Sequence, residues 1–158
     1  MTRLARPNLK NPIHLLAFGL GSGIAPKAPG TFGTLAAVPI FLLISSLSLS
    51  EYLFVVVFAS VIGVYLCVQT AKDLDVHDHP GIVWDEFVGF WIAMIAIPVS
   101  LWTLLAGFAL FRLFDIWKPW PIKWVDRQVA GGLGIMLDDI LAGLMALGSL
   151  HLLIALLA

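Results

Sequence analysis

Acidic residues gather in two short windows of a very apolar chain. Nine of the ten acidic residues lie within positions 73–86 and 115–139. Of all 158 residues, 60% are hydrophobic and only 12% are charged. Carboxylates next to hydrocarbon cost free energy, so they usually mark a function. Because clustered carboxylates with few neighbouring bases favour a hard cation such as Mg²⁺, this distribution predicts a metal site at a membrane surface.

Two pairs of adjacent acids stand where apolar segments begin. Asp85 and Glu86 precede the apolar stretch 87–111, and Asp138 and Asp139 precede the stretch 140–158. One acid would be enough for a favourable interaction with a helix N-terminus, which contributes about 0.3–1 kcal/mol. Since each place has two acids, we predict that all four are catalytic and bind metal. Asp138 has the alternative role of an ordinary N-cap.

A third acid lies between two bases in the segment 111–122. Arg112, Asp115 and Lys118 are spaced three residues apart, so a continuous helix would place them roughly on one face. Asp115 can assist at a metal site while Arg112 and Lys118 bind phosphate oxygens. The alternative is an interfacial belt, in which the neighbouring tryptophans lie at headgroup level beside snorkelling bases. That alternative does not account for Asp115.

The glycine- and proline-rich segment 19–34 has two interpretations. Successive backbone N–H groups in such a loop can form an anion-binding nest. Lys27 and Thr31 would then add donors for a phosphate group. Alternatively, the segment is a tight turn in which Thr34 caps the helix that follows.

Hydropathy predicts an all-α integral membrane protein that forms a single domain over residues 1–158. Segments 35–49, 53–71 and 140–157 each resemble one membrane helix. Segment 87–111 is either one span kinked at Pro98 or part of a hairpin of helices 85–97 and 101–114. The hairpin leaves all Lys and Arg residues on one face, which the positive-inside rule places in the cytoplasm. We therefore expect about five membrane helices, with an interfacial or re-entrant segment at 13–20.

Composition excludes some functions and disfavours others. The net charge of −1 predicts no nucleic-acid partner. The single cysteine, Cys67, excludes an intramolecular disulfide bond. A carboxylate-lined cation or proton transporter is the alternative function, but it would place acids near the middle of the spans. We expect no role in the site for Asp126, which lies outside the acidic pairs, and none for the isolated His14.

Four blocks of the chain resemble, in order, the phosphatidylglycerophosphatase A family. They are 18–34, 82–89, 111–122 and 131–143, and the run 115–121 (DIWKPWP) is especially specific. The resemblance implies Mg²⁺-dependent hydrolysis of the terminal phosphate of phosphatidylglycerophosphate, which gives phosphatidylglycerol. It also implies a multi-pass protein of the bacterial inner membrane, with its site on the cytoplasmic side and the bilayer and a phospholipid as partners. The sequence predicts no oligomeric state.

The residues and the resemblance together predict the composition of the site. Its members share a position in one of the four blocks. The predicted catalytic residues are Asp85, Glu86, Asp115, Asp138 and Asp139. The predicted Mg²⁺ ligands are Asp85, Glu86, Asp138 and Asp139, and the predicted phosphate-binding residues are Lys27, Thr31, Arg112 and Lys118.

Overall fold

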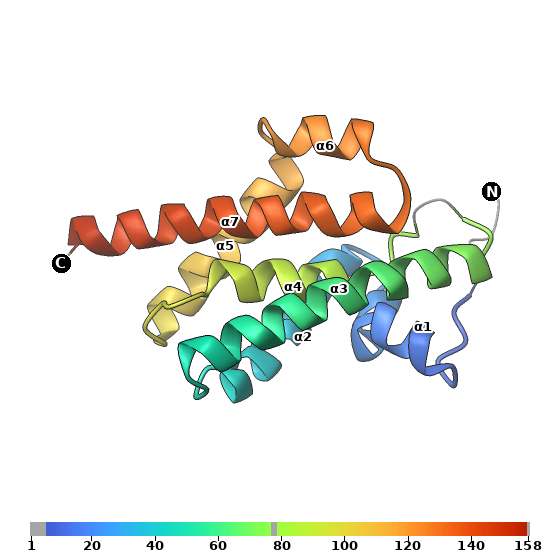
Figure 1. Ribbon diagram of the computed structural model, residues 1–158, viewed down its shortest axis with the longest axis horizontal. Coiled ribbons are helices and arrows are strands. Elements are labelled where there is room, and N and C mark those ends of the chain that lie inside the picture. The colour runs from blue at the N-terminus through green and yellow to red at the C-terminus, as the bar shows by residue number, and fades with distance from the viewer. Residues whose placement is uncertain (1–5, 77–78, 158) are drawn as a thin grey trace.

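The computed structural model describes residues 6–76 and 79–157, and all regular elements in these ranges are helices, as predicted (Figure 1). Within these described ranges, seven α-helices and one 3₁₀ helix follow one another. They are α1 (Pro12–Ala17), η1 (Gly19–Ile24), α2 (Pro29–Ile44), α3 (Leu49–Asp73), α4 (Trp84–Ala93), α5 (Leu101–Trp117), α6 (Ile122–Gln128) and α7 (Gly131–Leu157).

Two serine caps set where α3 and α5 begin. Ser48 forms a capping box with Glu51, which starts α3 at Leu49. The predicted helix 35–49 is therefore wrong at both ends, because α2 begins at Pro29 and ends at Ile44. Ser100 forms an equivalent box with Thr103 and starts α5. Both caps satisfy backbone N–H groups that the first helical turn leaves without partners.

Helix α4 lies at the centre of the bundle, between α2, α3 and α7 (Figure 1). All of its residues from Glu86 to Ala93 are buried. Two tryptophans satisfy their indole N–H groups across its interfaces: Trp91 donates to the Ala37 carbonyl at 3.1 Å, and Trp84 donates to the Ala59 carbonyl at 3.0 Å. These bonds fix α4 against α2 and α3, so its first turn is held in a defined position.

Helices α4 and α7 approach each other closely at a pair of glycines. A Cβ atom added to Gly143 would lie 2.4 Å from the Gly89 carbonyl oxygen. Small residues allow helix backbones to come this near. Gly89 lies four residues after Asp85, and Gly143 lies four residues after Asp139. The glycine contact therefore lies about one helical turn from Asp85 and from Asp139, and it brings these two acids close to each other.

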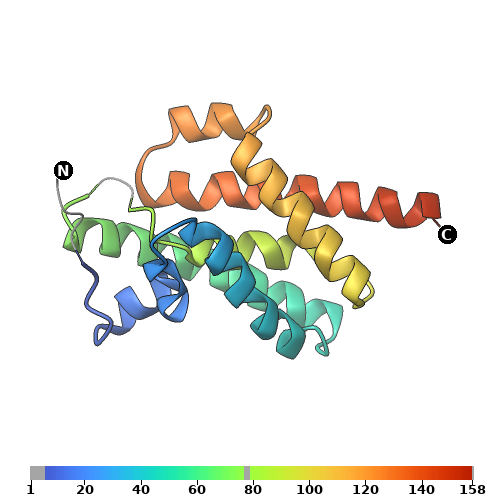
Figure 2. The same cartoon turned by 180° about the vertical axis from the view of Figure 1, so that it is seen from behind.

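The predicted division into two helices is confirmed, because α4 and α5 are joined by residues 94–100, but α4 ends at Ala93 rather than Ile97 and α5 ends at Trp117 rather than Phe114. The end of α5 returns to the start of α4, where Arg112 binds Glu86. From behind, the turn between α4 and α5 lies near the turn between α2 and α3, away from the N-terminus (Figure 2). The acids at the start of α4 and at the end of α5 are consequently at the same end of the bundle.

Two of the described helices, α3 and α7, are long and apolar enough to cross a membrane. Helix α2 is apolar but shorter, with 16 residues. Helix α4, with 10 residues, is about 15 Å long at 1.5 Å per residue. Membrane association is thus supported, while the number of about five membrane helices stays a prediction.

Candidate active site

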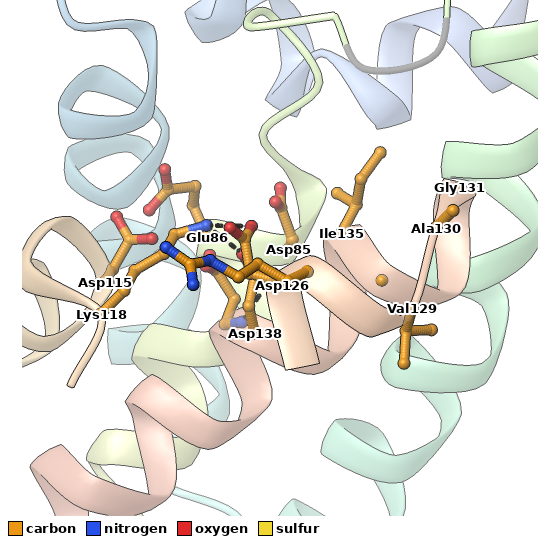
Figure 3. Close-up of a pocket in the computed structure, with 13 residues that line it drawn as sticks. Asp85, Glu86, Asp115, Lys118, Asp126, Val129, Ala130, Gly131, Ile135 and Asp138 are labelled. Atoms are coloured by element: carbon orange, nitrogen blue, oxygen red, sulfur yellow. Dashed lines mark hydrogen bonds and ion pairs between the residues drawn. The ribbon is translucent and has the colours of Figure 1, made fainter. Parts of the chain in front are cut away.

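One cavity of about 350 Å³ lies where α4, the end of α5, α6 and the first turns of α7 meet (Figure 3). All five acids predicted to be catalytic line this cavity, and Lys118 does too. Figure 3 shows the labelled acids on one side and the segment from Val129 to Gly131 on the other. The structure therefore brings together three blocks that are far apart in the sequence.

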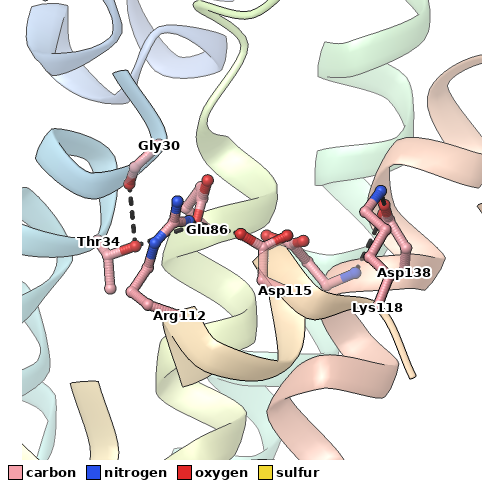
Figure 4. A network of polar contacts seen from close by, with 8 residues as sticks. Gly30, Thr34, Glu86, Arg112, Asp115, Lys118 and Asp138 are labelled. Atoms are coloured by element: carbon pink, nitrogen blue, oxygen red, sulfur yellow. Dashed lines mark hydrogen bonds and ion pairs between the residues drawn. The ribbon is translucent and has the colours of Figure 1, made fainter. Parts of the chain in front are cut away.

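Arg112 joins two of these acids. Its Nη1 atom donates to Glu86 Oε2 and lies 2.7 Å from Asp115 Oδ2 (Figure 4). Thr34 Oγ1, in the interior of α2, lies 3.0 Å from Glu86 Oε2 and 3.0 Å from the Gly30 carbonyl oxygen. Arg112 was predicted to bind phosphate, and in this structure its charge is already balanced by two carboxylates. Thr34 is not the helix cap considered from the sequence.

Lys118 joins two further acids. Its Nζ atom lies 2.6 Å from Asp138 Oδ2 and 2.6 Å from Asp126 Oδ1. Burial alone would lower the pKa of the ammonium group, but the hydrogen bonds to Asp126 and Asp138 raise it above its usual value. Lys118 ends α5 in the left-handed conformation, with φ 46°, and Pro119 follows it. Asp126, for which no role was expected, lines the cavity and binds the predicted phosphate-binding lysine.

Two buried carboxylate oxygens have no hydrogen-bond partner among the described residues. They are Asp85 Oδ1 and Asp139 Oδ2, which come from facing helices and line the same cavity. A buried carboxylate without a partner carries a large desolvation penalty. This pattern fits a cation that binds between the two acids. In the described part of the chain, however, no three Asp, Glu, His or Cys side chains converge into a preformed metal-ligand set.

The second acidic pair does not open a helix, contrary to the prediction. Helix α7 begins at Gly131, so Asp138 and Asp139 lie about two turns inside it. Asp138 is therefore not an N-cap. Gly132 in the first turn lies close to α3: a Cβ atom there would lie 2.6 Å from the Val68 backbone nitrogen.

The glycine- and proline-rich segment packs against the entrance to α4. A Cβ atom on Gly23 would lie 2.0 Å from the Gly81 carbonyl oxygen, and one on Gly30 would lie 2.0 Å from Glu86 Oε1. Lys27 is exposed in a bend, and Thr31 lies in the first turn of α2. Neither residue lines the acidic cavity. The structure does not group these two predicted phosphate ligands with the others.

A histidine that seemed isolated in the sequence has a partner outside the cavity. His14 Nε2 lies 3.0 Å from Asp73 Oδ2, and His14 Nδ1 accepts from the Asn8 backbone N–H at 3.1 Å. The pair joins α1 to the end of α3, 59 residues away. We assign it a structural role, because it fastens the N-terminal segment to the bundle.

The fold and the cavity together define an α-helical protein with membrane-length helices and a polar site of carboxylates and bases. A family model, described as phosphatidylglycerophosphatase A, matches residues 15–154. The chain belongs to this family, as the sequence resemblance indicated, and is a phosphoric monoester hydrolase.

Relatives of known name share most of the chain. Phosphatidylglycerophosphatase A of Escherichia coli (strain K12) is 54% identical over 148 residues, which cover 93% of this chain and 86% of the relative. Phosphatidylglycerophosphatase A of Haemophilus influenzae is 49% identical over 145 residues, covering 90% and 89%. A Bacteroides thetaiotaomicron protein, named provisionally as a phosphatidylinositol-3-phosphatase, is 38% identical over 136 residues, covering 82% and 85%. No solved structure matches.

Proposed function

We propose that this protein removes the terminal phosphate of phosphatidylglycerophosphate in a Mg²⁺-dependent reaction at the cytoplasmic face of the bacterial inner membrane. One observation supports the metal dependence: within the described part of the chain, two buried carboxylate oxygens of Asp85 and Asp139 have no hydrogen-bond partner in a cavity rich in acids. The family membership supports the substrate, since two relatives are named for it.

Asp85 and Asp139 are the residues best suited to hold the metal. The other two predicted ligands are engaged, Glu86 by Arg112 and Asp138 by Lys118. Mg²⁺ is commonly bound by one or two carboxylates, with waters and substrate phosphate completing its coordination. A set of two free carboxylates is therefore enough, even without three converging side chains. When bound, Mg²⁺ would polarise the phosphoryl group and favour deprotonation of a bound water.

The chain's own charged groups prepare the cavity for a phosphate monoester. Lys118 keeps its positive charge, since its pKa is raised, and it lines the cavity. A fixed donor there stabilises charge on the phosphoryl oxygens in the transition state. Asp138 and Asp126 hold the lysine from two helices, which limits its motion. A carboxylate at the cavity can orient or deprotonate the attacking water.

Exposed tryptophans support a place at the lipid headgroups. Trp117, Trp120 and Trp124 are 70%, 81% and 59% exposed, and they flank the end of α5 and α6 beside the cavity. Tryptophan is enriched at membrane–water interfaces. With the cavity at this level, the acyl chains of the substrate stay in lipid while its phosphate enters the site.

Phosphate release from purified protein tests the function. Wild type should release phosphate from phosphatidylglycerophosphate, EDTA should abolish the release, and Mg²⁺ should restore it better than Ca²⁺, because a Mg²⁺ site is small and nearly octahedral. Asp85→Asn should be folded but inactive. Phosphatidylinositol 3-phosphate is a useful second substrate, given the name of one relative. Full activity after exhaustive chelation would contradict the metal dependence.

Cysteine labelling tests the orientation. A cysteine replaces Lys123 on α6 in a Cys67→Ala background, and intact cells are treated with an impermeant thiol reagent. We expect labelling only after the membrane is opened. Labelling in intact cells would place α6, and with it the cavity, on the outer side.

A further inference from the structure

Three basic residues lie in or beside the cavity, and one of them differs from the other two in its partners. Arg112 and Lys118 are each bound by two carboxylates. Arg127 also lines the cavity, but it forms no ion pair with any residue that the structure describes. Of the basic side chains that line the cavity, Arg127 is thus the one whose charge no described residue compensates through an ion pair. A guanidinium offers forked donors that match phosphate oxygens.

Arg127 lies on the open side of the cavity. The acids on the opposite side are deeply placed, with Glu86, Asp138 and Asp139 only 8%, 7% and 2% exposed. Arg127 is exposed near the end of α6, two residues before the segment from Val129 to Gly131, which forms the other wall in Figure 3. The cavity thus has an acidic floor, where Lys118 binds Asp138, and an open lip at the end of α6, where Arg127 is exposed next to Asp126.

The substrate has a matching arrangement of charge. In phosphatidylglycerophosphate, the terminal phosphate is a monoester, and a glycerol unit separates it from a phosphodiester that leads to the diacylglycerol. If the monoester lies at the floor beside Lys118, the diester lies toward the lip. We propose that Arg127 binds the diester phosphate and so selects lipids whose monoester is one head-group unit away from a diester. This inference rests on the proposed function.

Paired kinetics on two lipids test the assignment. The first is phosphatidylglycerophosphate, and the second is phosphatidate, whose only phosphate is a monoester, with the same acyl chains in the same mixed micelles. Arg127→Ala should raise KM for the first lipid about tenfold, the lower limit for a hydrogen bond between charged groups. Relative to wild type, KM for phosphatidate and kcat for phosphatidylglycerophosphate should each change by less than about twofold. Arg127→Lys should give a smaller rise.

Lys123→Ala is the matched control, because Lys123 is an exposed base on the same helix that does not line the cavity. It removes the same charge and should leave both KM values unchanged. If Arg127→Ala and Lys123→Ala raise KM for phosphatidylglycerophosphate equally, the effect is general electrostatic attraction of an anionic lipid and not a specific contact. An equal rise on both lipids for Arg127→Ala alone would assign Arg127 to the monoester instead. Either result overturns the inference about Arg127, and the proposed function still holds as long as the wild-type protein is active. An inactive wild-type protein would overturn the proposed function itself.

Discussion

The contact between α4 and α7 makes a sharp prediction about Gly143. In Gly143→Ala, the new Cβ atom would lie 2.4 Å from the Gly89 carbonyl oxygen, whereas ordinary contacts begin at 3.4 Å. The obstructing atom belongs to backbone, so the helices must separate by about 1 Å, the difference between these distances. Overpacking of this kind typically costs about 1–3 kcal/mol.

The separation should harm activity more than stability. The contact lies one turn from Asp85 and one turn from Asp139, so it sets the distance between the two unpartnered acids. Misplacing catalytic groups by about 1 Å can reduce the rate about a hundredfold. We therefore expect Gly143→Ala to lose about two orders of magnitude in kcat while remaining folded.

Gly148→Ala is the matched control on the same helix, because a Cβ atom there would meet nothing within 4 Å. Alanine favours a helix over glycine by about 1 kcal/mol, so this variant should be at least as stable as wild type. Phosphate release and thermal unfolding are measured for both variants in one detergent. If Gly143→Ala matches Gly148→Ala in both measurements, the close glycine contact does not position the acids.

Further substitutions separate the polar contacts of the site. Arg112→Ala leaves two largely buried carboxylates without their partner, so the free energy of unfolding should fall by about 3–5 kcal/mol, measured by thermal or chemical denaturation. Asp138→Asn should reduce kcat by about a hundredfold or more, as expected for a group at the reacting centre. Asp126→Asn should reduce it less than about tenfold, because Lys118 retains Asp138; equal kinetics in the two aspartate variants would refute this difference in roles. Tyr52→Phe removes a 2.7 Å hydrogen bond to a backbone carbonyl of α4 and should lower stability by about 1 kcal/mol with normal kcat.

Hydropathy and charge were enough to predict the helical class and the hairpin. The distribution of Lys and Arg selected the hairpin, since helix propensity could not. The start of α3 was predicted at Leu53 and lies at Leu49, although Ser48 and Glu51 have the spacing of a capping box in the sequence. The start of α7 was missed, since glycines normally disfavour helices. Gly132 is favoured there only because α3 packs against it, which no local pattern reveals.

The sequence predicted which pairs of acids line the cavity, but it did not predict which bases those acids bind. Adjacent carboxylates beside apolar segments identified the four paired acids. Asp126 was missed because it binds Lys118 from another helix, eight residues away, with no spacing rule to connect them. The phosphate roles of Lys27 and Thr31 came from a loop pattern whose glycines serve close packing in this structure. Sequence identifies groups that are costly to bury, whereas their partners depend on the tertiary fold.

The order in which the chain is synthesised has a consequence for its biogenesis. Glu86 emerges 26 residues before Arg112, and Lys118 emerges 20 residues before Asp138. A nascent chain that ends after α4 would thus hold Glu86 without its counter-ion Arg112 among apolar helices. Helix α4 can settle stably only together with α5, and the hairpin is complete only when the start of α7 has joined it. We therefore expect the packing of this short central helix to be a late, cooperative event rather than an independent step.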